Sequence, residues 1–245
     1  PINYIIIHIN KFFSIQPEEL DWSNEMTIVP NNWMNRITEI KSLALLKSGE
    51  LLNTLLLSSG SQLDMRVSVL IPCYNEEKSI EKCIMWCLSQ TRQANEIIIV
   101  DDSSSDATPE ILKHYIDKIK VVKTPKNSGS KSYAQQFGLQ FVTGDIFITT
   151  DADTLIDSHF VEKIVADFED KTVVAVGGYV KSVRYNWLTA CRAFEYAIGQ
   201  NIHKVAQDCI NFMLVIPGAA GAFRTKVFKN YITFDHDTVA EDLDL

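Results

Sequence analysis

Two aspartates, Asp151 and Asp153, are separated by one alanine and directly follow the apolar run 146–150. Carboxylate oxygens are the ligands that Mg²⁺ and Mn²⁺ prefer, and these ions bind few protein groups together with phosphate oxygens. The pair therefore predicts a metal ion that holds a diphosphate and neutralises its charge as it leaves. The alternative is simple turn chemistry, because aspartate is common in turns. The position directly after an apolar strand favours the metal site.

Two more carboxylates, Asp101 and Asp102, end the apolar run 96–100. A carboxylate at such a place can accept a hydrogen bond from a base N–H, as in the recognition of uracil. The alternative is an ordinary strand-to-helix loop, which Asp106 alone would cap. We expect either Asp101 or Asp102 to contact a nucleotide base, and the pattern does not distinguish between them.

A polar loop, residues 126–132, contains Gly129 and runs into a predicted helix that begins at Lys131. Backbone N–H groups at the start of a helix attract phosphate, and Lys131 would add a positive charge there. The spacing of a P-loop is absent. A solvated loop explains the segment equally well when it is considered alone.

The elements that must position these residues are strands alternating with helices from residue 66 onward. Strands are predicted at 67–72, 96–100, 121–122, 145–150 and 173–176, and helices at 76–90, 106–119, 131–142 and 160–168. This alternation predicts an α/β fold with a mostly parallel sheet and right-handed crossovers. Ligands bind beyond the carboxyl ends of such strands. The rule therefore gathers the acidic residues and Tyr74 at one edge of the sheet.

The composition limits the classes of function. The chain has 245 residues, of which 46% are apolar, so it can form one large domain with a small appendage. A formal net charge of -8 argues against a nucleic-acid partner, which needs a basic face. Five scattered cysteines without a CxxC pair fit a reducing compartment. We find no signal peptide and no apolar run of about 18 residues.

Residues 1–64 differ from the remainder and contain no catalytic motif. A short strand is predicted at 4–9, one or two amphipathic helices at 33–57, and a linker at 58–61. We therefore divide the chain into an accessory or docking region, 1–64, and a catalytic domain, 65–245. The chain begins with Pro1 and stops inside an acidic motif, which indicates a fragment or a processed chain.

Four motifs in order resemble glycosyltransferase family 2 over residues 66–245. Residues 69–77 resemble the opening nucleotide motif of this family, and residues 99–106 resemble its uridine-binding strand end. Asp151-Ala152-Asp153 resembles its metal-binding DxD motif, which implies Mg²⁺ or Mn²⁺ on Asp151 and Asp153. The resemblance implies a GT-A fold and a UDP-sugar donor. The implied nucleotide-sugar-binding residues are Pro72, Tyr74, Asn75, Glu76, Asp101, Asp102, Lys131 and Asp151.

The last part of the chain resembles membrane-bound processive polysaccharide synthases. Residues 217–224 resemble their acceptor-site segment, and residues 237–245 resemble their TED motif with Ala240 in place of threonine. The resemblance implies Asp242 as the catalytic base, and Gly218, Arg224 and Glu241 as acceptor-binding residues, although Arg224 fits a structural role equally well. Similarity over 201–223 is highest to poly-N-acetylglucosamine synthases, and next to hyaluronan, chitin and cellulose synthases. The chain stops before the QxxRW motif and the transmembrane helices of these synthases.

The implied activity is inverting transfer of a sugar, with N-acetylglucosamine as first candidate, from a UDP-sugar to a glycan acceptor at the cytoplasmic face of a membrane. The aromatic and basic segment 179–208 is interpreted as an interfacial helix or as a helix over the acceptor cleft. Two alternatives stay open: a non-processive transferase acting on a glycan or lipid, and a non-catalytic nucleotide-sugar-binding module. A sugar-nucleotide pyrophosphorylase is disfavoured because no GxGxR signature lies near the first strand. The sugar, linkage, acceptor and oligomeric state are not predicted.

Overall fold

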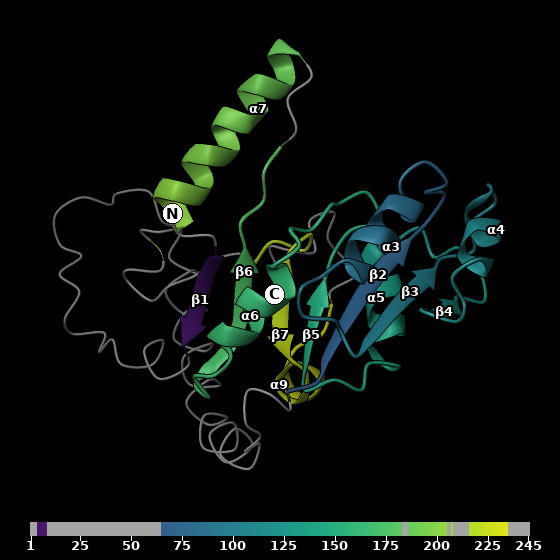
Figure 1. Ribbon diagram of the computed structural model, residues 1–245, viewed down its shortest axis with the longest axis horizontal. Helices are drawn as coiled ribbons and strands as arrows, with labels where there is room; N and C mark the ends of the chain where they lie inside the picture. Colours follow the sequence, from purple (N-terminus) through teal and green to yellow (C-terminus); the bar gives the residue numbers. More distant parts are fainter. Residues whose placement is uncertain (1–3, 9–64, 183–185, 205–206, 208–215, 235–245) are drawn as a thin grey trace, which may run out of the picture.

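The computed structural model describes residues 4–8, 65–182, 186–204, 207 and 216–234 (Figure 1). These residues form a seven-stranded sheet with the order β1-β6-β7-β5-β2-β3-β4. The predicted α/β class and mostly parallel sheet are confirmed, since five strands run in one direction and β1 and β7 run in the other. The strands are β1 Tyr4–His8, β2 Val67–Cys73, β3 Glu96–Asp101, β4 Lys120–Lys123, β5 Ile146–Thr149, β6 Val173–Gly178 and β7 Gly221–Arg224.

Helices cover both faces of the sheet, so β2 is buried along its whole length. Side chains alternate along a strand: Val69 and Ile71 join an apolar cluster with α3 (Ile80–Leu88), α4 (Thr108–Lys113) and α6 (Phe160–Asp167). Leu70 points to a second cluster with α5 (Lys131–Leu139) and α9 (Thr225–Tyr231). The two-sided core explains why the central strands are continuous apolar runs in the sequence.

Helix α3 begins later than predicted. Its apolar face is as expected, with Ile80, Cys83 and Ile84 buried against the sheet. The expectation that Glu76 and Glu77 lie in its first turn is wrong, because residues 76–79 form a separate turn. In that turn the backbone oxygen of Glu76 accepts hydrogen bonds from the backbone N–H groups of Ser79 and Ile80. The turn leaves Glu76 at the edge of the sheet and not on a helix.

Helix α5 lies unusually close to β2 and β3. A Cβ atom added at Gly138 would come within 2.4 Å of Val100 Cγ2 and 2.6 Å of Leu70 Cδ1. Real Cβ atoms do not approach other atoms so closely, so a larger residue would require the Val100 and Leu70 side chains or the helix to move. The first residue of this helix is Lys131, which the close approach holds over the ends of the strands.

Strand β7 was not predicted, because residues 217–224 were interpreted only as an acceptor segment. It is inserted antiparallel between β5 and β6. Strand β1 pairs with β6 and so belongs to the sheet, although it comes from the region 1–64. The predicted helices at 33–57 and the linker at 58–61 lie outside the described residues, and the division at residue 64 stays a prediction.

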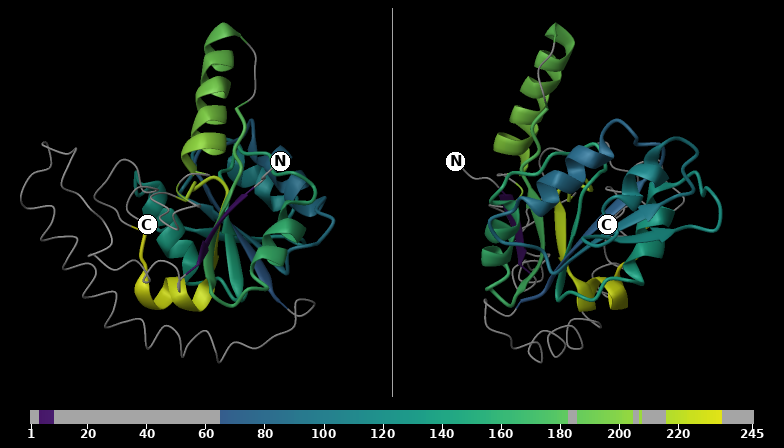
Figure 2. Two further views of the ribbon diagram at one scale, coloured as in Figure 1. Left: turned by 90° about the vertical axis from the view of Figure 1, so that its left-hand side faces the viewer. Right: turned by 45° about the vertical axis from the view of Figure 1, so that its right-hand side comes forward.

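Helix α7 (Trp187–Ile198) and the π-helical turn Gly199–His203 extend away from the body of the domain (Figure 2). Asn186 caps this helix by accepting a hydrogen bond from the backbone of Thr189. Among the described residues, no helix combines the length and the apolar character needed to span a bilayer.

Candidate functional site

A cavity of about 450 Å³ opens at the edge of the sheet where β2, β3 and β5 end. Its walls come from the segment after β2, the start of α5 with the loop before it, and the loop after β5. The carboxyl ends of neighbouring parallel strands meet at this edge, as expected for the ligand site of an α/β sheet. The lining residues are Pro72, Cys73, Tyr74, Glu76, Asp102, Asn127, Gly129, Ser130, Lys131, Ala134, Asp151, Ala152 and Asp153.

Most of the predicted nucleotide and metal residues meet in this cavity. The ones that line it are Pro72, Tyr74, Glu76, Asp102, Lys131, Asp151 and Asp153. Asn75 and Asp101 are not among the lining residues. The structure thus brings together side chains that are about 80 residues apart in the chain.

Asp101 and Asp102 differ in what they face, although both are buried. Asp101 Oδ1 accepts a 2.8 Å hydrogen bond from the backbone N–H of Ser104, so this carboxylate shapes the loop after β3. The carboxylate of Asp102 accepts from Thr124 Oγ1 at 2.7 Å, and from the backbone N–H and Oγ of Ser128 at 3.0 and 2.8 Å. The N–H of Ser128 also lies 3.2 Å from Asp102 Oδ1, so it is shared between the two oxygens; since a carboxylate has about four acceptor positions, these three donors leave room for a fourth. Of the pair, Asp102 is the one at the cavity.

Asn75 does not line the cavity but supports its wall through hydrogen bonds. Its backbone has a φ of 55°, a left-handed conformation that asparagine tolerates better than most residues. Its side-chain oxygen accepts a 2.8 Å hydrogen bond from the backbone N–H of Ser105, and its own N–H donates to Ser104 Oγ at 3.0 Å. Asn75 therefore joins the segment after β2 to the loop after β3.

Lys131 and Asp151 form an ion pair across the cavity, with Nζ and Oδ1 2.8 Å apart. Both side chains are about one third exposed. Oδ1 of Asp151 is buried, and no well-aligned hydrogen bond reaches it from the described part of the chain. The ammonium group of Lys131 therefore neutralises this oxygen. A metal ion or a charged ligand would bind at the same place.

The residues present fit a hard divalent cation. Asp151 and Asp153 both line the cavity and offer oxygen ligands, with Glu76 also in the wall. No group of three His, Cys, Asp or Glu side chains converges on one point within the described ranges. An ion bound here would therefore use one or two carboxylates together with oxygens of the ligand, which is typical of Mg²⁺ and Mn²⁺.

The sequence matches the family model described as "Glycosyl transferase family 2" over residues 68–231. The chain belongs to glycosyltransferase family 2. Among curated proteins, this glycosyltransferase is 29% identical over 179 residues to a hyaluronan synthase from Streptococcus pyogenes, covering 69% of this chain and 42% of the relative. It is 26% identical over 190 residues to an N-acetylglucosaminyltransferase from Azorhizobium caulinodans, covering 74% and 48%. The chain thus spans less than half the length of these relatives.

Solved structures show the same GT-A fold for this glycosyltransferase. A mannosyltransferase from Pyrobaculum calidifontis, in complex with GDP-Man and Mn²⁺, has a TM-score of 0.57 at 23% identity and covers 73% of this chain and 50% of its own. TarS from S. aureus, residues 1–349 in complex with UDP-GlcNAc, has a TM-score of 0.55 at 22% identity and covers 73% and 51%. The predicted family, fold and enzyme class are therefore confirmed.

The cysteines at the site of this glycosyltransferase are not nucleophiles. Burial, together with the nearby Asp101 and Glu76 carboxylates, raises the pKa of Cys73 to about 12. The pKa of Cys83 is also raised, first by its hydrogen bond with Cys87 and then by burial. Thiols at neutral pH are poor nucleophiles, so the chemistry of the cavity belongs to its oxygen and nitrogen groups.

Arg224 has a structural environment in this glycosyltransferase. Its guanidinium is buried and donates to the backbone oxygens of Val173 at 2.6 Å, Phe168 at 2.9 Å and Asp170 at 2.9 Å. Burial lowers the pKa of Arg224, which nevertheless stays charged at neutral pH. Of the two roles predicted for Arg224, these contacts favour the structural one, because all three bonds tie β7 to the turn between α6 and β6.

The remaining predicted acceptor residues lie near the sheet edge or outside the described residues. Strand β7 runs antiparallel, so its start, Gly221, pairs with Thr149 close to Asp151. Gly218 therefore precedes β7 on the same side of the sheet as the cavity. Glu241 and Asp242 lie outside the described residues.

The residues that support the site have weaker signals in the sequence. Thr124 and Ser128, which hold Asp102, were not predicted. Ser128 lies in the polar loop 126–132, for which only phosphate binding was predicted. A polar residue paired with a buried strand-end carboxylate could have been sought there, since buried carboxylates need donors.

Proposed function

We propose that this protein is the catalytic core of a polysaccharide synthase that transfers a sugar from a UDP-sugar to a glycan hydroxyl. The observation that carries the proposal is the meeting of Asp102, Lys131, Asp151 and Asp153 in one cavity. A base-recognising acceptor, a cation and two metal-type carboxylates are the groups that a nucleoside diphosphate requires. N-acetylglucosamine is the first candidate for the transferred sugar.

The donor is proposed to lie along the cavity wall. Asp102 would accept a hydrogen bond from the uracil N–H through its remaining acceptor position, and Tyr74, which is half exposed, offers a flat surface for the base. Lys131 would turn from Asp151 toward the diphosphate, which carries more negative charge than one carboxylate. A Mg²⁺ or Mn²⁺ ion held by Asp151 and Asp153 would neutralise charge on the departing UDP.

Asp242 is proposed as the base that takes the proton of the acceptor hydroxyl. The backbone N–H of Phe234 donates to Gln136 Oε1 at 3.2 Å, which fastens the chain to α5. Gln136 is five residues beyond Lys131, roughly 7.5 Å along the helix. The eight residues from Phe234 to Asp242 can extend over roughly 26–29 Å. The end of the chain is therefore long enough to bring Asp242 to the cavity.

The names of relatives support the sugar and the polymer. One relative is a hyaluronan synthase and another is an N-acetylglucosaminyltransferase. TarS, which shares the fold, was solved in complex with UDP-GlcNAc. Because the chain spans less than half of these relatives, its own sugar, acceptor and polymerising ability are proposals.

Contact with a membrane surface is proposed to involve α7. Trp187, Cys191, Phe194, Ile198 and Ile202 follow helical spacing and form a stripe, and Trp187 is 77% and Phe194 69% exposed. The buried residues Ala193 and Gln200 are on another side of the helix. Exposed aromatic residues with arginine nearby, here Arg192, are typical of helices lying in a bilayer interface.

Vesicle sedimentation tests the membrane contact. The chain should pellet with phosphatidylglycerol–phosphatidylcholine vesicles, and the double change Trp187→Ser and Phe194→Ser should abolish pelleting. The matched control is Leu155→Ser, an exposed apolar residue away from α7, which should pellet like the wild type. Equal pelleting of all three proteins would contradict the role of α7.

A screen of UDP-sugars with Mn²⁺ or Mg²⁺ tests the catalytic proposal. We expect binding of UDP that depends on the metal ion and turnover with UDP-N-acetylglucosamine. Asp242→Asn should lower transfer by about 10²–10⁴-fold, the usual worth of a positioned base, while UDP binding persists. Loss of UDP binding in this variant would count against the base assignment, and absence of metal-dependent UDP binding in the wild type would refute the proposal.

A further inference from the structure

The acidic loop, residues 150–159, connects β5 to α6 and carries Asp151 and Asp153. Its first half is fixed by packing: Ala152 and Ile156 are buried in the same apolar cluster as Ile80 and Cys83 of α3. Cys83 Sγ also lies 3.6 Å from the backbone oxygen of Asp151, as a weak hydrogen-bond donor. Because Asp153 is exposed between these buried positions, its place depends on how the loop is attached to α3.

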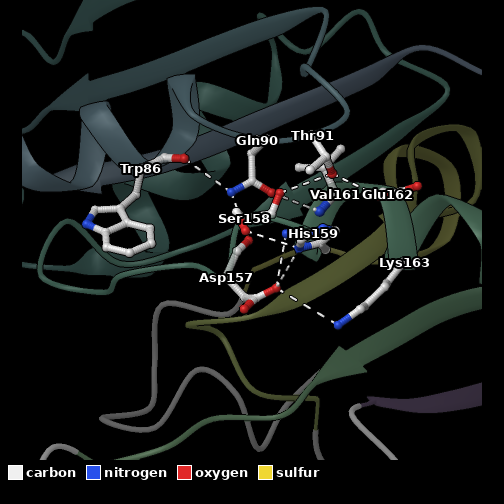
Figure 3. Close-up of polar contacts among 9 residues, drawn as sticks. All are labelled: Trp86, Gln90, Thr91, Asp157, Ser158, His159, Val161, Glu162 and Lys163. Atoms are coloured by element: carbon white, nitrogen blue, oxygen red, sulfur yellow. Dashed lines mark hydrogen bonds and ion pairs between the residues drawn. The ribbon is translucent and has the colours of Figure 1, made fainter.

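The second half of the acidic loop is fixed by one buried amide at the end of α3 (Figure 3). Gln90 is only 3% exposed. Its Nε2 donates to the backbone oxygen of Asp157 at 2.9 Å and to that of Trp86 at 3.1 Å. Its Oε1 accepts from the backbone N–H of Val161 at 3.1 Å. One side chain therefore bridges α3, the acidic loop and the first turn of α6.

Helix α6 explains why an amide is needed at this position. Its N-cap residue, His159, makes no side-chain cap hydrogen bond. The first N–H groups of a helix have no partner inside the helix and require another acceptor. Gln90 supplies that acceptor for Val161 from a different element, and at the same time satisfies the carbonyl of Asp157. An apolar side chain of the same size would leave the Val161 N–H without this acceptor, and the carbonyl of Asp157 would keep only its bond from the backbone N–H of Phe160, at 2.9 Å.

Thr91 adds a second attachment beside Gln90 (Figure 3). Its backbone N–H donates to the backbone oxygen of Ser158 at 2.8 Å. Its hydroxyl donates to Glu162 Oε2 at 2.8 Å and lies 3.2 Å from the same oxygen of Ser158. Gln90 and Thr91 together thus bond to four residues of the segment 157–162: Asp157, Ser158, Val161 and Glu162.

We propose that Gln90 is a positioning residue that sets the geometry of Asp151 and Asp153 for a metal–diphosphate ligand. The inference rests on the proposed function, because it assigns a metal role to those two aspartates. Gln90 does not line the cavity, so it acts through the acidic loop and not by touching the ligand. Loss of its bonds releases the end of the loop while Asp102 and Lys131 keep their places.

The test compares Gln90→Met with Gln93→Ala in the whole chain. Gln93 is the matched control, because it is an exposed glutamine three residues later whose amide donates only to Leu88 and Gln90 oxygens within α3 and its end. Affinity for UDP is measured by calorimetry without metal and over a Mn²⁺ titration. We expect Gln90→Met to raise the Mn²⁺ midpoint about tenfold and to leave metal-free UDP affinity within twofold. Gln93→Ala should match the wild type in both measurements.

The design separates positioning from general destabilisation. A folded Gln90→Met protein with the wild-type Mn²⁺ midpoint would overturn the inference, as would an equal loss of metal-free and metal-dependent UDP affinity. Thr91→Val is the milder variant if Gln90→Met does not fold: it keeps the backbone bond to Ser158, and a Mn²⁺ midpoint raised about twofold is expected. An unchanged midpoint in Thr91→Val would then overturn the inference. A wild-type chain that binds no UDP with Mn²⁺ refutes the proposed function itself.

Discussion

Charged side chains are used in opposite ways at the cavity edge of the sheet and at the turn between α6 and β6. At the cavity edge, Asp153 is exposed, and Lys131 and Asp151 neutralise each other while remaining partly open to solvent. At the turn, Arg224 is buried and donates to three backbone oxygens. A charged residue in a motif that resembles a family motif is therefore a candidate for binding a ligand when its charge faces a cavity, and a structural residue when backbone groups already satisfy it.

The largest effect should follow from Asp153→Asn, which removes a charge from the cavity edge. We expect sugar transfer to fall by at least a hundredfold, because a metal ion contributes several kcal/mol of charge stabilisation. Mn²⁺-dependent UDP binding should be lost while the protein stays folded. Asp117→Asn, an exposed carboxylate outside both the cavity wall and the acidic loop, should leave both unchanged. Equal losses in the two variants would erase the distinction between the cavity edge and other exposed carboxylates.

Arg224→Met should affect folding instead of binding. The buried backbone oxygens of Phe168 and Val173 would lose the guanidinium donor, at a cost of about 2–4 kcal/mol in the free energy of unfolding. Urea denaturation measures this cost, and UDP affinity of the folded variant should match the wild type. Lys226→Met, an exposed charge in α9, provides the control and should change stability by less than about 0.5 kcal/mol. A stable Arg224→Met protein with weakened acceptor use would restore the acceptor-binding role of Arg224.

Asp101 and Asp102 allow the comparison to be sharpened between adjacent residues. Asp102→Asn should weaken UDP binding about tenfold, or about 1.4 kcal/mol, because a base N–H would lose a charged acceptor. Asp101→Asn keeps the oxygen that Ser104 needs and should leave UDP affinity within about twofold, as a neutral acceptor there suffices. Calorimetry with UDP decides the matter, and a greater loss from Asp101→Asn would reverse the assignment.

The smallest effect concerns Asp167, at the end of α6. Burial raises the pKa of this carboxyl to about 7. The unfolded chain loses the proton near pH 4 and the folded chain near pH 7, so stability falls as pH rises through this window. Asp167→Asn should remove about 1 kcal/mol of this dependence, allowing for partial exposure. Thermal unfolding between pH 4 and pH 8 measures it; identical pH profiles would show that the carboxyl is solvated.

The sequence was sufficient for the parallel part of the sheet, because β2, β3 and β5 are continuous apolar runs with polar residues directly after them. It did not reveal β7, whose four residues include an arginine and a glycine and give no periodic signal. The reversal that β7 introduces depends on pairing with β5 and β6, which are distant in the chain. The local sequence pattern of a strand does not show contacts with strands that are distant in the chain.

For the site, the rule that ligands lie beyond strand ends was sufficient to gather the pair Asp101 and Asp102 with Asp151 and Asp153 at one edge of the sheet, where three of the four line the cavity. Which of Asp101 and Asp102 faces the cavity could not be decided from the sequence. Successive side chains of a strand point to opposite faces, and two identical residues in a row do not show which face each one takes. The role of Gln90 was not predicted either, since an isolated glutamine near a helix end has no characteristic sequence pattern. Its role becomes visible only when α3 and α6 are placed side by side.

Gly138 influences the width of the cavity, because it lets α5 pack closely on β2 and β3. The helix that contains it is in direct contact with the strands, and its first turn brings Lys131 and Ser130 to the cavity. A methyl group added at Gly138, two turns from Lys131, would press on Val100 and Leu70, and these side chains or the helix would have to move, although neither side chain lines the cavity. The distance between Lys131 and the ends of β2 and β3 thus depends on the absence of a side chain at Gly138. That distance in turn limits the size of the ligand group that fits between them.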